Sequence, residues 1–273
     1  MRRLRTFLLG TARVAAALAL CLLPLLSGCE KPLAADDLSS AVAAVDHRDW
    51  SEAERLLRRC LREEQAPDRR WTAWRLLLQV ANLAGEESKT SLAYLDAMLE
   101  EFADDDARAR DILLQMAALN EATHRYARAV DVWSSFVGLA GLPPEELVRG
   151  YSGLAINQMK QRLFESAEET LQQCLGLPVP YKAKLPCMFE LADLRSTQER
   201  WQEAADYSQE ILDFLPGNEL RGLAGFLLAD ALEQLGRNQE ALNRFEETRE
   251  FFPNDAVVDN RIAQLRKKLN KRS

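Results

Sequence analysis

A small side chain returns every 37 or 38 residues through most of this sequence. The spacings between successive positions are 38, 38, 38, 37 and 37 residues, and the positions are Ala53, Ser91, Ala129, Ala167, Ala204 and Ala241. A period in this range is typical of proteins built by stacking one small structural unit many times. The low content of glycine and proline, 12 and 10 residues in 273, favours long helices over a turn-rich β-structure.

Each unit has the pattern of a helix hairpin. A second small residue lies twelve positions before the marker in every unit except the second, which has Gln79 there; these residues are Ala41, Ala117, Ala155, Ala192 and Ala229. Four positions after the marker the side chain is mostly large, as in Leu57, Trp133 and Phe245. Small residues let two antiparallel helices cross closely, and large ones fill the space beside the crossing. The pattern predicts an all-α protein of stacked helix hairpins.

The repeats resemble the tetratricopeptide repeat. The resemblance is carried best by the last unit, through Leu228, Ala229, Leu232, Ala241, Phe245 and Pro253, and Pro216 closes the fifth unit in the same way. It implies a right-handed α-solenoid of about six hairpins over residues 38–253, with the second repeat the most degenerate. Residues 254–273 are expected to form a capping helix and a basic tail, since Val257, Val258, Ile262, Leu265 and Leu269 make one apolar stripe.

The N-terminus has the features of an export signal. Arg2, Arg3 and Arg5 precede an apolar run over residues 14–26, which is too short to cross a bilayer. The run ends at residues 26–29, Leu-Ser-Gly-Cys, which resemble a bacterial lipobox with Cys29 as the lipidated residue. We expect a signal peptide over 1–28 and a tether over 29–37 that holds the domain at the outer membrane, facing the periplasm. An ordinary signal peptide with an incidental cysteine is the alternative.

Charge and motif content exclude several functions. Residues 1–28 hold four arginines and no acidic residue, so the net charge of −7 becomes −11 without them, which disfavours nucleic-acid binding. No glycine-rich phosphate loop, paired cysteine motif or serine-hydrolase motif is present. With only two histidines we expect no metal site, no cofactor and no enzymatic activity. An accessory cell-wall enzyme is the catalytic alternative.

The resemblance also implies a binding surface, because the first helices of such hairpins line a concave groove. The matching positions form an asymmetric set, apolar in the first two repeats and charged or aromatic later: Leu38, Val42, Val45, Leu76, Val80, Arg149, Ile156, Met159, Lys160, Phe189, Asp193, Phe226, Asp230 and Glu233. Aromatic rings beside carboxylates suit a basic, partly apolar segment of a partner protein. Packing of Phe189 and Phe226 between neighbouring helices, with Val42 and Leu76 in the core, is the alternative.

Three cysteines lie beyond the lipobox. Cys60 and Cys174 are each seven residues after a marker alanine, a position that in this fold packs against the start of the next repeat. For Cys174 that segment contains Cys187, so a disulfide between these two is one interpretation and a pair of buried thiols is the other. Cys60 is left over in either case.

The combined features predict a membrane-anchored periplasmic scaffold that binds partner proteins in envelope assembly. Proteins that look like this serve β-barrel insertion, pilus or secretin biogenesis, or the cell-wall machinery, and the sequence does not choose among them. A structural subunit that self-associates through Leu38, Val42 and Leu76 is the second hypothesis.

Overall fold

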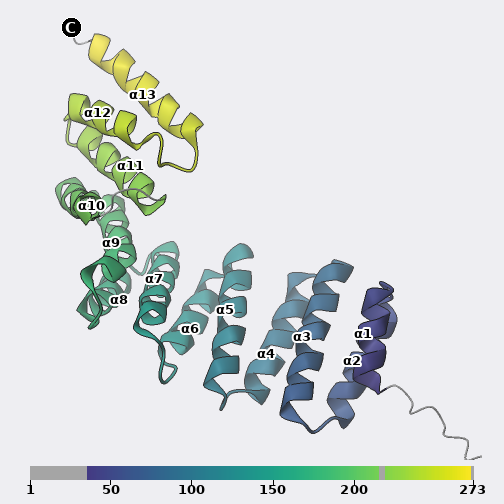
Figure 1. Ribbon diagram of the computed structural model, residues 1–273. Helices are drawn as coiled ribbons and strands as arrows, with labels where there is room; N and C mark the ends of the chain where they lie inside the picture. Colours follow the sequence, from purple (N-terminus) through teal and green to yellow (C-terminus); the bar gives the residue numbers. More distant parts are fainter. Residues whose placement is uncertain (1–35, 215–218, 272–273) are drawn as a thin grey trace, which may run out of the picture.

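The computed structural model describes residues 36–214 and 219–271, and these residues form thirteen α-helices, one 3-10 helix and no strand. Twelve of the helices pair as hairpins, which are α1 (Asp37–Asp46) with α2 (Trp50–Glu63), α3 (Pro67–Ala84) with α4 (Ser88–Glu101), α5 (Asp106–Ala122) with α6 (Tyr126–Val137), α7 (Pro144–Lys160) with α8 (Phe164–Gly176), α9 (Leu185–Thr197) with α10 (Trp201–Phe214), and α11 (Glu219–Gln234) with α12 (Asn238–Thr248). The 3-10 helix η1 (Tyr181–Lys184) precedes α9, and α13 (Asp255–Asn270) ends the array. The hairpins lie side by side in a solenoid (Figure 1). The predicted all-α solenoid is therefore confirmed.

The periodic residues lie where the helices of each pair cross. All six markers are almost completely buried, with exposed fractions of 0–2%. Large residues four positions later, such as Leu57, Leu171 and Phe245, are fully buried beside them. The small residues let the two helices of a pair approach closely, and the large residues fill the space beside the crossing. Both the hydrophobic effect and close packing favour this arrangement.

Repeat two departs from this scheme by one inserted residue. In the other hairpins the middle of three turn residues is left-handed, as at Arg48, where φ is 60°. In repeat two the first turn residue, Gly85, is left-handed instead, with a φ of 73°, and two residues follow it before α4 begins. The residue equivalent to the upstream alanines is therefore Leu78, which is buried, and Gln79 is exposed. Because of the insertion, the position twelve residues before the marker Ser91 is the polar Gln79, and the equivalent of the upstream alanines lies one residue earlier.

The apolar core is divided into three clusters along the array. One apolar cluster runs from α1 to α7, a second joins α7, α8 and α9, and a third runs from α9 to α13. The row of helices turns at α8 and α9, between the first and the third cluster (Figure 1). Helix α13 buries Val258, Ile262 and Leu265 against the last cluster, as a capping helix should, whereas Val257 of the predicted stripe is exposed.

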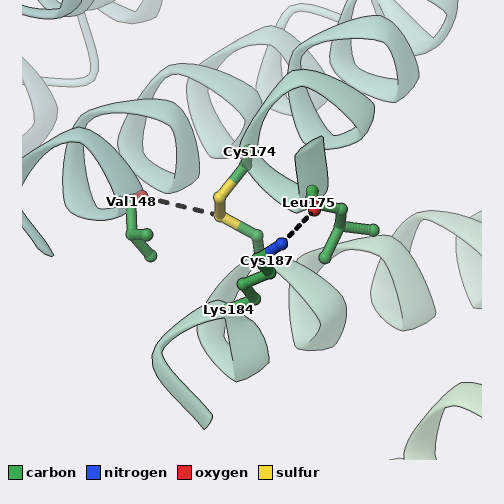
Figure 2. Close-up of a disulfide and its surroundings, with 5 residues drawn as sticks. All are labelled: Val148, Cys174, Leu175, Lys184 and Cys187. Carbon is green, nitrogen blue, oxygen red and sulfur yellow. Dashed lines mark hydrogen bonds between the residues drawn. A yellow bond between two sulfur atoms is a disulfide. The ribbon is translucent and has the colours of Figure 1, made fainter. Parts of the chain in front are cut away.

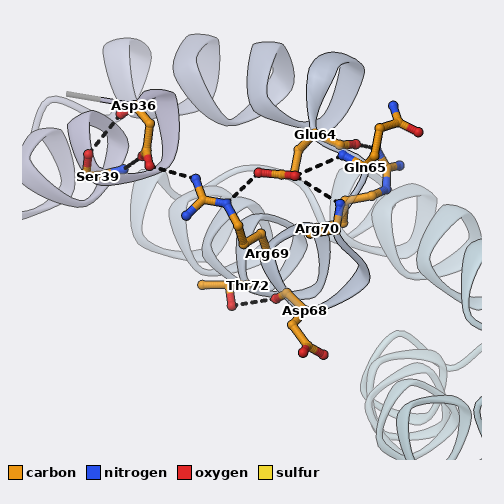
Figure 3. Close-up of polar contacts among 9 residues, drawn as sticks. Asp36, Ser39, Glu64, Gln65, Asp68, Arg69, Arg70 and Thr72 are labelled. Atoms are coloured by element: carbon orange, nitrogen blue, oxygen red, sulfur yellow. Dashed lines mark hydrogen bonds and ion pairs between the residues drawn. The ribbon is translucent and has the colours of Figure 1, made fainter. Parts of the chain in front are cut away.

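A polar network fastens the start of the array (Figure 3). Asp36 caps α1 by accepting a hydrogen bond of 2.8 Å from the Ser39 amide, and it also accepts one of 2.7 Å from Arg69 Nη2. Arg69 bridges to Glu64, which caps the turn before α3 by accepting from the amides of Gln65 and Ala66. These donors hold the pKa of Asp36 down at about 2, so the carboxylate stays charged across the physiological range.

The predicted signal peptide, Cys29 and Pro216 lie outside the described residues. Within 36–214 and 219–271, none of the helices combines the length and the apolar character that a membrane crossing requires.

Candidate protein-binding groove

Two adjoining cavities open along α7, and we call them together the α7–α9 groove. The first has a volume of about 600 Å³, and its lining residues are Glu121, Trp133, Glu145, Val148, Arg149, Ser152, Gly153, Ile156, Ala183 and Pro186. The second has about 430 Å³, and its lining residues are Ile156, Met159, Lys160, Arg162, Phe164, Glu190, Asp193 and Thr197. Ile156 belongs to both cavities, so the groove is continuous from the N-terminal half of α7 to the C-terminal half of α9.

The floor of the first cavity is the indole of Trp133. Its Nε1 donates a hydrogen bond of 2.7 Å to Glu121 Oε1, which also accepts one of 2.6 Å from Asn157 Nδ2. Gly153 leaves room for the ring, because a Cβ there would lie 2.5 Å from Trp133 Cε2. The ring is thus held by α5 and packed on the backbone of α7, and it presents a fixed apolar surface to the cavity.

The second cavity holds two carboxyl groups that lie near Lys160. Glu190 and Asp193 are one turn apart on α9, and neither makes a hydrogen bond or ion pair with a residue in the described part of the chain. Loss of solvent, together with the charge of the neighbouring Asp193, raises the pKa of Glu190 to about 8, while Lys160 opposes the shift. Burial raises the pKa of Asp193 as well. A cation entering this cavity would favour the ionised form of both carboxyl groups, because its attraction offsets the cost of their desolvation and their mutual repulsion.

The structure brings five of the predicted positions into this groove, namely Arg149, Ile156, Met159, Lys160 and Asp193. It places four others elsewhere. Phe189 packs partly buried in the C-terminal core, and Phe226 stacks on Phe252 with ring centroids 4.6 Å apart. Asp230 and Glu233 both pair with Arg261 of α13, and Glu233 also pairs with Lys268.

The remaining predicted positions divide between core and surface. In the first repeats, Leu38, Val45 and Leu76 pack partly buried against the N-terminal core and Val80 is fully buried, whereas Val42 is 42% exposed. Sequence reasoning missed Trp133, Gly153 and Glu190 as parts of the groove. A glycine inside a helical pattern and two acids at i and i+3 were the signals that point to them.

A disulfide joins Cys174 at the end of α8 to Cys187 in the first turn of α9, with 6.4 Å between the Cα atoms (Figure 2). Both residues are fully buried, and Cys187 Sγ lies 3.5 Å from the carbonyl oxygen of Val148 in α7. Lys184 Nζ adds a hydrogen bond of 2.6 Å to the Leu175 carbonyl oxygen. The bond therefore fixes the segment that carries Ala183 and Pro186, which form one edge of the groove. Cys60 is a free, buried cysteine whose thiol pKa is raised by burial.

The fold and groove define a class, the helical-repeat proteins whose stacked hairpins present a hollowed surface. Within that class, the tetratricopeptide-repeat family model matches residues 223–255. Similar solved structures include a tetratricopeptide-repeat protein from Parabacteroides merdae, with 14% identity over 86% of each chain and a TM-score of 0.59. The chain therefore shares the fold of tetratricopeptide-repeat proteins, and one repeat of that family is matched in its sequence.

Two further structures share the fold. PilW, described as a widely conserved type IV pilus biogenesis factor, has 15% identity, a TM-score of 0.52 and coverage of 82% of this chain and 96% of its own. The apo form of RapI has 12% identity, a TM-score of 0.53 and coverage of 86% and 75%. No curated protein matches the sequence. At these identities the likeness shows the fold alone.

Proposed function

We propose that the protein is a lipid-anchored scaffold of the bacterial envelope that binds a segment of a partner protein in the α7–α9 groove. The observation that carries the proposal is the pairing of an apolar cavity floored by Trp133 with an adjoining cavity that holds Glu190 and Asp193 unpaired. The first accepts a large apolar side chain and the second accepts a cation. The expected ligand is a basic, partly apolar segment.

The envelope assignment is supported by the resemblance of residues 26–29, which end at Cys29, to a lipobox and by the similarity in fold to PilW. Anchoring would raise the effective concentration of a weak partner near the membrane without any new contact. β-Barrel insertion, pilus or secretin biogenesis and cell-wall assembly are the processes that such a scaffold would serve. A helical-repeat fold with a groove of this kind supports a binding role rather than a catalytic one.

Photo-crosslinking in living bacteria tests the groove. A photoreactive residue at Ile156, which belongs to both cavities, should give one dominant crosslinked envelope protein, identified by mass spectrometry. The same probe at Gln173, an exposed residue of α8, is the matched control and should not capture that protein. If Ile156 crosslinks only to a second copy of the chain, the proposal is wrong and the hypothesis of a self-associating structural subunit takes its place.

The anchor is tested by Cys29→Ala. The variant should fold, because the array begins at residue 36, but it should move from the membrane fraction to the soluble periplasmic fraction or accumulate unprocessed. Retention of a processed variant in the membrane fraction at the wild-type level would contradict lipid anchoring.

A further inference from the structure

A separate cavity lies between α10 and α12, which are the second helices of the last two hairpins. Its volume is about 420 Å³. Leu228 and Leu232 of α11 are buried and form an apolar floor, whereas the lining from α10 and α12 is polar except for Ala205 and Leu-free. We call this cavity the α10–α12 pocket. It shares no lining residue with the α7–α9 groove, which follows the first helices of its hairpins.

The corresponding space one repeat earlier is filled by a guanidinium group. Arg195 of α9 is only 5% exposed, and its two terminal nitrogens donate hydrogen bonds of 2.8 and 2.5 Å to the Glu168 carboxylate of α8. Its Nε lies 3.4 Å from Glu203 Oε2 of α10. Because a planar guanidinium can bind carboxylates along more than one edge, this single side chain joins the two second helices α8 and α10.

In the last repeat this cation and its main partner are replaced by apolar residues. A spacing of 37 residues relates Arg195 to Leu232, Glu168 to Ala205, and Glu203 to Glu240. All three counterparts line the α10–α12 pocket. The guanidinium and the carboxylate that binds it at two points are therefore missing there, whereas the glutamate of the following second helix is kept. The pocket corresponds to the space that a guanidinium occupies in the preceding repeat.

The charged lining of the pocket has more acids than bases, namely Asp206, Glu240, Glu247, Arg237 and Arg244. Arg237 donates hydrogen bonds of 2.8 and 2.6 Å to Glu240. In the preceding repeat Arg200 binds Glu203 in the same way, through bonds of 2.7 and 2.6 Å. Glu203 meets Arg195 in addition to this partner. The pairing with Arg237 therefore leaves Glu240 able to meet a second guanidinium.

Asp206 of α10 supplies another carboxylate. Within the described residues it forms no ion pair, and it accepts a hydrogen bond of 2.8 Å from Gln202 Nε2. A carboxylate can accept about four hydrogen bonds, so oxygen lone pairs remain for further donors. An arginine side chain fits both parts of the pocket, because its aliphatic stem can lie on the leucines while its fork of N–H donors meets the acids. A lysine ammonium is a compact charge and cannot bind both helices in this manner.

We propose that the α10–α12 pocket binds an arginine side chain of a partner protein. The guanidinium lies between Asp206 of α10 and Glu240 of α12, in the place that Arg195 takes one repeat earlier. The inference rests on the proposed scaffold function only in that the ligand is a protein. Because the pocket lies between second helices and shares no lining residue with the α7–α9 groove, binding at one site can fail without the other.

Peptide selection tests the ligand chemistry. Random heptapeptides displayed on phage are selected for binding to the wild-type protein and against binding to a double variant with Asp206→Asn and Glu240→Gln. The enriched peptides should share an arginine. In a synthetic peptide, replacing that arginine by citrulline, which is similar in shape but neutral, should weaken binding about tenfold or more. Replacement by lysine should also weaken it, since the bidentate geometry is lost.

Single variants of the protein test the position of the site. Asp206→Asn and Glu240→Gln should each weaken binding of the selected peptide about tenfold. Glu169→Gln is the matched control for Asp206→Asn, because Glu169 is exposed at the equivalent position of α8, 37 residues earlier, and it should leave the affinity unchanged. Ile156→Asp, in the α7–α9 groove, should also leave it unchanged. Circular dichroism should show the same helix content for the variants at the exposed acids.

Several results would each overturn the proposal. They are an absence of enrichment, enriched peptides without a common arginine, equal affinity of the citrulline peptide, and unchanged affinity in the single variants of the pocket. If the selected peptides instead lose affinity in Ile156→Asp and keep it in Asp206→Asn, they occupy the α7–α9 groove. The pocket would then be wrongly assigned, whereas the proposed function would stand.

Discussion

Single side chains determine the chemistry of the groove, and Glu190 is the clearest case. Its neighbours in the second cavity are Asp193 of its own helix, Lys160 of α7 and Arg162 of the following turn. The folded-state pKa of about 8 is above the ordinary value of 4.5, so the folded protein holds a proton there that the unfolded chain releases. The free energy of unfolding therefore falls as the pH rises from 4.5 to 8.

Glu190→Gln should remove this dependence. We expect the variant to be more stable than the wild type at pH 9 by roughly 2 kcal/mol, and nearly equal to it below pH 5. Urea unfolding at the two pH values measures the difference. Glu169→Gln, at an exposed position of α8, should leave the pH profile unchanged. A Glu190→Gln profile parallel to that of the wild type would contradict the assignment of the shift.

Gly153 is the residue that positions Trp133. In Gly153→Ala the new Cβ meets the indole at 2.5 Å, so the ring must move, and the gain in helix propensity does not offset the overpacking. We expect the free energy of unfolding to fall by about 1–2 kcal/mol. A photoreactive residue at Ile156 should also crosslink less of the partner protein. Gly176→Ala is the control, because nothing lies within 4 Å of its added Cβ. Thermal unfolding that shows both variants equally stable would rule out the steric role.

At the scale of helices, the sequence predicted the hairpins because burial at the crossings repeats with the period. The markers and the large residues beside them follow from local packing, which a pattern of small and large residues captures. Counting could not detect the insertion after Gly85, since the spacing between markers stayed at 38 while the register of α3 shifted by one residue.

The candidate site was less predictable, because it depends on which element covers each first helix. Asp230 and Asp193 occupy equivalent positions 37 residues apart. The first is neutralised by Arg261 of the capping helix, whereas the second remains unpaired in a cavity. Phe226 is likewise covered by Phe252 from the loop that precedes α13. Periodicity identifies the face of a helix but not the neighbour that meets it.

The disulfide between α8 and α9 gives a prediction about how these two helices are held together. Replacing both Cys174 and Cys187 by alanine should lower the free energy of unfolding by about 3 kcal/mol, because the bond closes a loop of 13 residues. Dithiothreitol should lower the stability of the wild type to a similar extent. It should have no effect on the double variant, which serves as the control. Equal stability of the wild type with and without reductant would contradict a structural role for the bond.

Over the whole molecule, the cores are arranged in a line, and each hairpin packs mainly on the hairpins next to it. Such arrays lose structure from the ends or at weak junctions rather than all at once. The turn at α8 and α9 divides the molecule into an N-terminal arm and a C-terminal arm closed by α13 (Figure 1). The α7–α9 groove lies at the division, where a partner would contact both arms.

This linear organisation predicts how damage at the C-terminus propagates. Leu265 of α13 is fully buried in the C-terminal core. Leu265→Ala should lower the free energy of unfolding of the C-terminal helices by about 2–5 kcal/mol. Hydrogen exchange should then show loss of protection over α11–α13 while α1–α5 keep theirs, because no part of the N-terminal core includes these helices. Lys267→Ala, at an exposed position two residues away, should leave exchange unchanged. Uniform loss of protection from α1 to α13 would instead mean that the array unfolds as one cooperative unit, with the turn at α8 and α9 transmitting stability between the arms.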